Sequence, residues 1–252
     1  MNLMKAESPG PSVSKLVPKV QSTAKILYTI YILMTVVEMV FLLLGGMPLF
    51  DTLCLSFGTA GTGGFGIKNE SIASYSTYNQ IVITVFMILF GVNFNAYYLL
   101  LSKKVMQAAK NEEVRYYLGI IGLAIVAIAV NTRDMFTSFG RAFQQAAFQV
   151  GSIITTTGYA TTDFNVWPVF SKTILVILMF VGACAGSTGG GIKVSRLLIL
   201  CKSARKELQL YLHPNAVKKI KMDEKAIPHE VVRATNMFLF VYIMIFVTSL
   251  LV

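Results

Sequence analysis

Residues 58–66 read GTAGTGGFG and residues 151–159 read GSIITTTGY, and these two stretches decide the fold. Placed on one another so that Thr62 falls on Thr156, an offset of 94 residues, both follow the pattern Thr-x-Gly-aromatic-small. Such a match at a fixed spacing indicates an internal repeat. A repeat determines the overall architecture, so it is considered before the individual helices.

Each glycine-dense stretch follows a short apolar segment, at residues 50–57 and 139–149. Segments of about 8 to 12 residues are too short to cross a bilayer, which takes roughly 20 residues. Non-helical backbone at membrane depth is tolerated only where protein or a water-filled cavity surrounds it. We therefore expect two re-entrant helices, each followed by a loop that lines a cavity.

The chain as a whole has the composition of an integral membrane protein. Of its 252 residues, 55% are hydrophobic and only 13% are charged, about half the usual charged fraction of soluble domains. The apolar residues form blocks, which predict five membrane spans at about 24–46, 80–101, 114–130, 166–186 and 231–252. The fold class expected is an all-α integral membrane protein of span–pore helix–span repeats, two complete and one partial.

The net charge of +10 is explained by membrane orientation. Eighteen of the 22 Lys and Arg residues lie before residue 26, between residues 103 and 115, or between 193 and 233. Loops rich in Lys and Arg stay in the cytoplasm, so we expect a cytoplasmic N-terminus and filter loops that enter from outside. With the charge explained in this way, no nucleic-acid partner is expected.

The repeated pattern suits a cation filter. Potassium filters use backbone carbonyls of Thr-x-Gly-Tyr-Gly loops in place of the ion's water shell. Glycine permits the dihedral angles that turn successive carbonyls to one axis. We expect the aromatic residues Phe65 and Tyr159 to pack each loop sideways, and the negative end of each re-entrant helix to favour a cation.

With these motifs and residues 182–193, GACAGSTGGGIK, the sequence resembles the Trk/Ktr/HKT superfamily of potassium transporters, most closely its bacterial TrkH-type members. The resemblance covers nearly the whole chain from Lys15 onward. It implies K⁺ as the transported ion, no organic cofactor, and a plasma membrane location, in bacteria the inner membrane. The ion-binding backbone positions that it implies are Thr62, Gly63, Gly64, Thr156, Thr157 and Gly158.

The third motif interrupts an apolar span with residues that form poor helix, since each glycine costs about 1 kcal/mol relative to alanine. In the superfamily this loop blocks the permeation path below the filter. The resemblance therefore implies a gate formed by Gly186, Ser187, Thr188, Gly189, Gly190 and Gly191. We expect Lys193 and Arg196, at its cytoplasmic exit, to act as an electrostatic latch. Membrane anchoring of those cations and simple helix packing of the glycines are the alternatives.

This chain departs from the superfamily, whose members carry four repeats around a pseudo-fourfold pore. It divides into a lead-in at 1–21, repeats at 22–103 and 104–210, and a partial repeat at 211–252. Two loops from one copy do not close a ring, so we expect a fragment of the transporter, with mutual completion by several copies as the alternative.

Other polar residues are expected to be structural. Glu38 lies in mid-span, where ionisable groups are costly and usually functional; we expect a neighbouring helix or pore water to neutralise it. Lys172 is expected to snorkel, and Asn93 and Asn95 to bond between helices. The cysteines and histidines lack metal-ligand spacing.

The function expected is K⁺ transport across the plasma membrane through carbonyl-lined filter loops. A homodimer and a cytosolic nucleotide-binding regulatory subunit are implied by the resemblance, with the basic residues 202–225 as docking surface or as a contact for anionic lipid. The alternatives are a membrane-embedded enzyme that binds a phosphorylated or lipid substrate, although no acid, base or nucleophile is suitably placed, and a non-conducting scaffold.

Overall fold

The structure is a computed structural model that describes residues 20–213, 219–223 and 225–251, with side chains from residue 24 onward. Most of the described residues are helical, and the few strand residues form one small antiparallel hairpin. The predicted lead-in at 1–21 lies almost entirely outside the described residues.

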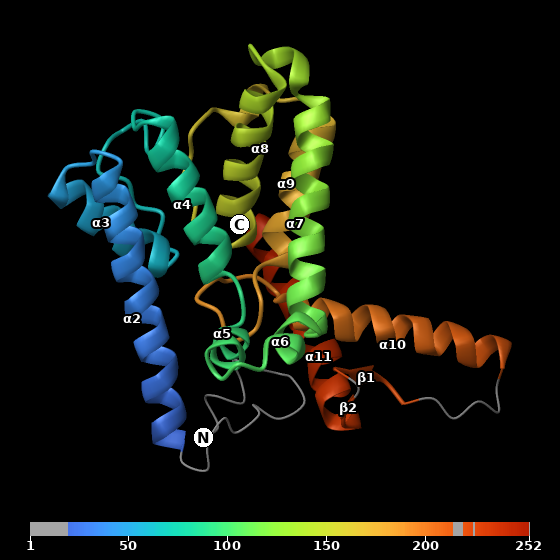
Figure 1. Cartoon of the computed structure of the whole chain (residues 1–252). Helices are drawn as coiled ribbons and strands as arrows, with labels where there is room; N and C mark the ends of the chain where they lie inside the picture. The colour runs from blue at the N-terminus through green and yellow to red at the C-terminus, as the bar shows by residue number, and fades with distance from the viewer. Residues whose placement is uncertain (1–19, 214–218, 224, 252) are drawn as a thin grey trace.

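The first half of the chain forms a long outer helix, a short helix, and a descending pair of helices that is sharply bent. Figure 1 shows α2 in blue running up to α3, and α4 returning toward α5. The bounds are α2 Val20–Leu44, α3 Leu49–Ala60, α4 Thr77–Phe90, α5 Phe94–Leu101 and α6 Val105–Ala109.

The second half repeats this order and then leaves the bundle. In Figure 1, α7 rises, α8 descends beside it, and α10 projects sideways at the lower end. The bounds are α7 Glu112–Asn131, η1 Arg133–Met135, α8 Phe139–Ile154, η2 Phe164–Val166, α9 Val169–Val181, α10 Val194–Leu212, β1 Lys221–Met222, β2 Lys225–Ala226 and α11 His229–Leu251.

Three helices among the described residues are long and apolar enough to span a membrane: 24–44, 112–131 and 229–251. Each runs for at least the roughly 20 residues that a bilayer requires. A fourth span is possible if α4 and α5 are counted together, although the pair is bent by 92°. The two predicted re-entrant segments are the helices α3 and α8, both longer than predicted.

The expected continuous span at 80–101 is broken, and the cause is side-chain packing. The Tyr117 hydroxyl from α7 donates to the Ile88 carbonyl over 3.1 Å and fills the space beside Gly91. A Cβ on Gly91 would lie 2.1 Å from that hydroxyl. Asn93 then caps the new helix α5, accepting from the Asn95 amide over 2.9 Å.

The expected span at 166–186 is helical only in α9, because the chain leaves the helix at Gly182. Gly182 has φ +72°, and a Cβ there would lie 2.4 Å from the Gly190 carbonyl oxygen. The irregular segment therefore runs from 182 to 193, longer than the six residues predicted; we call residues 182–193 the glycine loop. It folds back on itself, since the Ala183 amide donates to Gly190 O over 3.3 Å.

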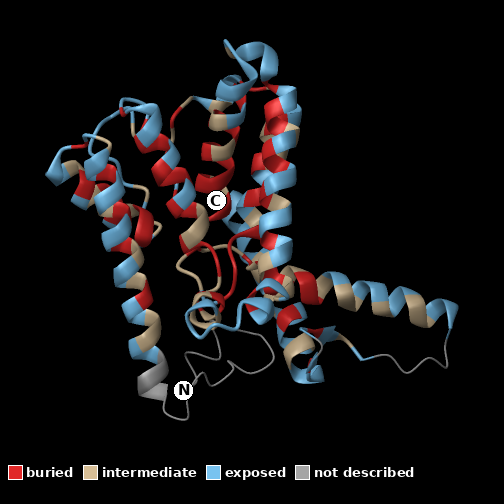
Figure 2. Ribbon diagram, in the orientation of Figure 1, coloured by how far each residue is buried: buried red, intermediate tan, exposed pale blue. Residues whose placement is uncertain are grey.

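Two apolar clusters support these helices. One joins α7, α8, α9 and the start of α10 around the buried Tyr117. The other joins α2, α3 and α4 and takes in Phe148 and Tyr159 from the second half of the chain. Figure 2 shows buried residues on the facing sides of α4, α7 and α8 and along the glycine loop, so the best-packed region surrounds the two repeated loops. By contrast, α11 buries only 6% of its apolar window.

Candidate functional site

The two repeated loops have the same backbone conformation at matching positions. Thr62 and Gly64 have φ of +50° and +69°, and Thr156 and Gly158 have φ of +59° and +90°. A left-handed conformation is uncommon for a non-glycine residue, yet it occurs at both threonines. Each loop thus alternates left-handed and ordinary residues, which turns successive carbonyls to a common side.

Six carbonyl oxygens in these loops accept no hydrogen bond from any described residue. The flanking carbonyls of Gly61, Thr155 and Tyr159 each accept one, over 2.8, 2.6 and 2.6 Å. Only Thr157 of these six residues is buried, and the other five are partly or fully exposed. The row of free oxygens between paired neighbours is therefore open to a ligand that needs oxygen atoms. The six belong to Thr62, Gly63, Gly64, Thr156, Thr157 and Gly158, the residues predicted as the filter.

Short helices hold the first loop in place. The Gly63 amide donates back to Gly58 O over 2.8 Å, at the end of α3. Beyond the loop, the Tyr75 hydroxyl donates to the Asp51 carboxylate over 2.8 Å. Burial and the neighbouring Asp51 raise the pKa of Tyr75, so this phenol keeps its proton, and its bond, throughout the physiological pH range.

The second loop is held more tightly, by α8. Ser152 receives the Thr157 amide on its carbonyl over 2.9 Å and donates its hydroxyl to Tyr159 O over 2.6 Å. The Tyr159 side chain is 1% exposed and its hydroxyl donates to Leu55 O of α3 over 3.2 Å. Tyr159 therefore packs between the repeats, as expected, whereas Phe65 is 86% exposed and does not brace the described part of its loop.

The loops touch each other along their length. A Cβ added to Gly64 would lie 1.7 Å from Thr157 O, so only glycine fits against that carbonyl. At the outer end, the Ile72 amide donates to Ala160 O over 3.0 Å, and the Ala160 amide donates to the Ser71 hydroxyl over 3.2 Å. The two rows of free carbonyls are thus fixed side by side.

The glycine loop lies directly against the inner ends of both repeated loops. The Thr62 hydroxyl shares its one proton between Gly61 O at 2.8 Å and Thr188 O at 3.1 Å. The Gly190 amide donates to the Thr156 hydroxyl over 2.7 Å. In addition, a Cβ on Gly189 would lie 2.9 Å from Thr155 O. Residues 188–190 therefore close off the space below the two threonines.

The two cations predicted as a latch lie in different surroundings. The Lys193 ammonium donates to Gly189 O within the glycine loop. Arg196 is 9% exposed, and its guanidinium lies 3.9 Å from the centre of the Phe238 ring on α11. Lys193 is thus part of the loop, while Arg196 connects α10 to α11.

The remaining predicted polar residues are placed as follows. Glu38 is fully buried and no described residue bonds its carboxylate. The exposed Lys172 ammonium donates to Asn165 O over 3.1 Å. Asn93 does bond between helices, to Glu113 of α7 over 3.2 Å, whereas Asn95 Oδ1 has no partner among the described residues.

The sequence did not predict a role for Glu113. In the structure its buried carboxylate accepts from the Ala185 amide within the glycine loop and from the Ser195 amide just after the loop. Glu112 and Glu113 are adjacent acids in the first turn of α7, and no pattern distinguishes them. In the structure Glu112 pairs with Lys202 at the surface, while Glu113 is 2% exposed.

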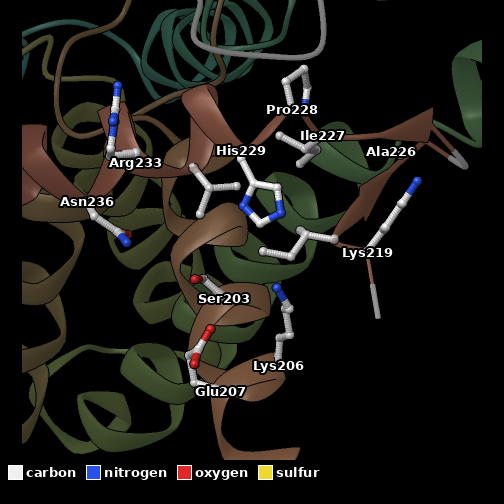
Figure 3. A pocket seen from close by; sticks show the side chains of 12 residues that line it. Ser203, Lys206, Glu207, Lys219, Ala226, Ile227, Pro228, His229, Arg233 and Asn236 are labelled. Carbon is white, nitrogen blue, oxygen red and sulfur yellow. The ribbon is translucent and has the colours of Figure 1, made fainter. Parts of the chain in front are cut away.

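A separate pocket of about 480 Å³ lies between α10, the β-hairpin and the start of α11. Figure 3 shows basic side chains around it from α10, from Lys219 just before β1, and from α11. The charged residues and histidine that line it are Lys206, Glu207, Lys219, His229 and Arg233. It overlaps the predicted basic docking stretch at Ser203, Lys206, Glu207, Lys219 and Ile220, extends beyond it to Asn236, and includes no residue of the two repeated loops.

Comparisons with known proteins agree with this geometry. The sequence profile of the TrkH family, described as cation transport protein, matches residues 1–123 and 116–252. The Trk system potassium uptake protein TrkH of Salmonella typhimurium is 37% identical over the whole chain, and that of Escherichia coli K12 is 36% identical. The alignment covers 53% of each of those proteins, so this chain spans about half their length.

A solved structure shows the same arrangement. The crystal structure of the potassium transporter TrkH from Vibrio parahaemolyticus superposes with a TM-score of 0.89 at 35% sequence identity. The match covers 99% of this chain and 55% of that one.

Proposed function

Because this chain belongs to the TrkH family of cation transport proteins, we propose that it supplies two filter loops to a pathway that carries K⁺ across a membrane. The relatives named above are potassium uptake proteins. The chain spans about half their length, so the pathway is completed by further loops, from a longer protein or from further copies.

The observation that carries this proposal is the pair of free carbonyl rows. Hard cations are bound by oxygen atoms, and K⁺ filters use backbone carbonyls for this purpose. Here the carbonyls of 62–64 and 156–158 are free, adjacent and held from behind by α3 and α8. A cation that has shed its water finds replacement ligands there without any movement of the backbone.

We assign the gate to the glycine loop. It contacts Thr62 and Thr156 through Thr188 O and the Gly190 amide, so an ion that leaves the filter inward meets residues 188–190 at once. Lys193 adds a positive charge at this place, which opposes a cation. The gate therefore lies immediately below the filter rather than deeper in the cytoplasmic half.

The orientation and the partners also belong to the proposal. The start of α2, α6 and α10 lie at one end of the molecule (Figure 1), and the predicted cytoplasmic Lys and Arg residues are concentrated on and around these segments. We place this end in the cytoplasm, at the bacterial inner membrane. The basic pocket in Figure 3 would then face a cytosolic nucleotide-binding regulatory subunit, and a homodimer would bring two copies together.

The proposal is tested by rubidium uptake through the assembled transporter in proteoliposomes. Deletion of residues 186–191 should raise uptake roughly tenfold, as loss of about 1.4 kcal/mol of barrier implies, with the K⁺ over Na⁺ preference nearly unchanged. Gly190→Ala should have a smaller effect in the same direction, because its Cβ would lie 2.9 Å from Thr156 Oγ1.

The matched control is Gly119→Ala, where an added Cβ meets no described atom within 4 Å; its uptake should equal that of wild type. Unchanged uptake in a well-folded deletion variant would show that the glycine loop is a packing element and that the gate lies elsewhere.

A further inference from the structure

Glu113 places a carboxylate where the chain enters and leaves the glycine loop. Its Oε1 accepts from the Ala185 amide over 2.6 Å and from the Ser195 amide over 3.2 Å. Residue 185 lies near the start of the loop, and residue 195 lies in the first turn of α10, just after the loop ends. One oxygen atom therefore joins both ends of a segment that has no helical hydrogen bonds of its own.

The second oxygen reaches the break between α4 and α5. Glu113 Oε2 accepts from the Asn93 side-chain amide over 3.2 Å. The next residue in the chain, Phe94, donates its backbone amide to Gly186 O over 3.1 Å. The loop is thus tied to α7 directly and to the α4–α5 break through the same carboxylate.

Because the Glu113 carboxylate is buried, its stability depends on these hydrogen bonds. Glu113 is 2% exposed, and a buried carboxylate is costly unless hydrogen bonds replace its water. Three donors do so here, and hydrogen bonds to an ionised group are about twice as strong as neutral ones. Movement of the loop away from α7 would break the bond from Ala185 and leave the charge with the Ser195 and Asn93 donors only.

We propose that Glu113 is a positioning residue that holds the glycine loop across the pathway, and that release of the loop from Glu113 is part of opening. This inference rests on the proposed function of the loop as a gate. According to this inference, a carboxylate on α7 holds the glycine loop in its closed position, although the two are far apart in the sequence.

The test uses the polarity of the Glu113–Asn93 pair. In Glu113→Gln one carboxylate oxygen becomes an NH₂ group, which is a donor. Depending on the side-chain rotamer, this donor faces either the Asn93 side-chain NH₂ or the Ala185 and Ser195 backbone N–H groups, so at least one hydrogen bond is lost. Asn93→Asp puts two carboxylates together. In the double variant, the introduced glutamine can still accept from both backbone amides and donate to the introduced aspartate, whose other oxygen can still cap α5.

Rubidium uptake should therefore rise roughly tenfold in each single variant and return to within about twofold of wild type in the double variant. A merely structural loss of packing would not be reversed in this way. The matched control is Glu112→Gln, which changes the neighbouring acid that pairs with Lys202 and should leave uptake unchanged.

If Glu113→Gln does not give folded, monodisperse protein, Asn93→Ser replaces it. Serine can cap α5 but cannot reach Glu113, so we expect a rise of about threefold. Normal uptake in folded Glu113→Gln or Asn93→Ser, while deletion of 186–191 still raises uptake, would overturn the role of Glu113 alone. If that deletion has no effect either, the gate itself is wrong.

Discussion

At the scale of residues, the proposed filter contains two glycines, Gly64 and Gly158, that occupy equivalent positions in the repeat but have different surroundings. Both have positive φ, which costs most residues about 1–2 kcal/mol. Gly64 also lies against the Thr157 carbonyl of the other loop, whereas a Cβ at Gly158 meets no described atom within 4 Å. The sequence repeat makes the two glycines look alike, and the contact between the loops makes them unequal.

This inequality gives a prediction for alanine substitutions. Gly64→Ala should displace Thr157 O, one of the proposed ion ligands, and reduce the K⁺ over Na⁺ preference of the assembled transporter by roughly tenfold or more. Gly158→Ala adds only the backbone strain of about 1–2 kcal/mol and should reduce that preference less. Competition of Na⁺ with rubidium uptake measures both. Equal losses in the two variants would contradict the contact between the loops.

At the scale of elements, the bend between α4 and α5 creates the space that the glycine loop occupies. The Cys184 amide donates to Gly91 O over 3.0 Å, and the Thr188 amide donates to Phe90 O over 3.4 Å. A straight helix would use these carbonyls for its own bonds. The break therefore provides the acceptors that hold the loop.

The bend should consequently be sensitive to the size of residue 91. In Gly91→Ala, the new Cβ would lie 2.1 Å from the Tyr117 hydroxyl and 2.9 Å from Thr155 Cγ2. Overpacking of this kind typically costs about 1–3 kcal/mol, so the melting temperature in detergent should fall by several degrees. Tyr117→Phe in the same chain removes the nearest atom and should recover part of the loss. A melting temperature equal to that of wild type in Gly91→Ala would contradict the packing described here.

How far the sequence predicts these elements depends on whether the cause is local. The repeat at Thr62 and Thr156 predicts both loops, and the structure gives them the same alternating φ values. Hydropathy predicts α2, α7 and α11 as spans, because the length of an apolar block is a local property. The bend at Gly91 depends on Tyr117 of α7, which is distant in sequence, so no local pattern shows it. The loop start at Gly182 depends on Gly190 of the same motif, and there the sequence predicts the loop but not its full length.

The same limit applies within the site. Glu113 was missed because its role comes from contact with Ala185 and Ser195, more than 70 residues later. Phe65 was expected to brace the first loop by analogy with Tyr159, yet only Tyr159 is buried among the described residues. A repeated motif predicts backbone conformation better than it predicts what each side chain packs against.

At the scale of the whole molecule, the two halves of the chain meet at the two repeated loops, and the glycine loop lies against both. The membrane core supplies no water to the backbone, so carbonyls that no described residue pairs must face a water-filled cavity or bind another partner. A family of cation transport proteins and an unpaired double row of carbonyl oxygens together point to an ion as that partner.

The central claim is that the carbonyls of residues 62–64 and 156–158 bind the transported ion. The most direct measurement is anomalous diffraction from crystals of the assembled transporter grown with Rb⁺ in place of K⁺. The account predicts anomalous peaks between these two loops, within direct coordination distance of their carbonyl oxygens, and their loss when Rb⁺ is exchanged for Na⁺. Rb⁺ peaks found elsewhere in the same crystals, with none between the two loops, would contradict it.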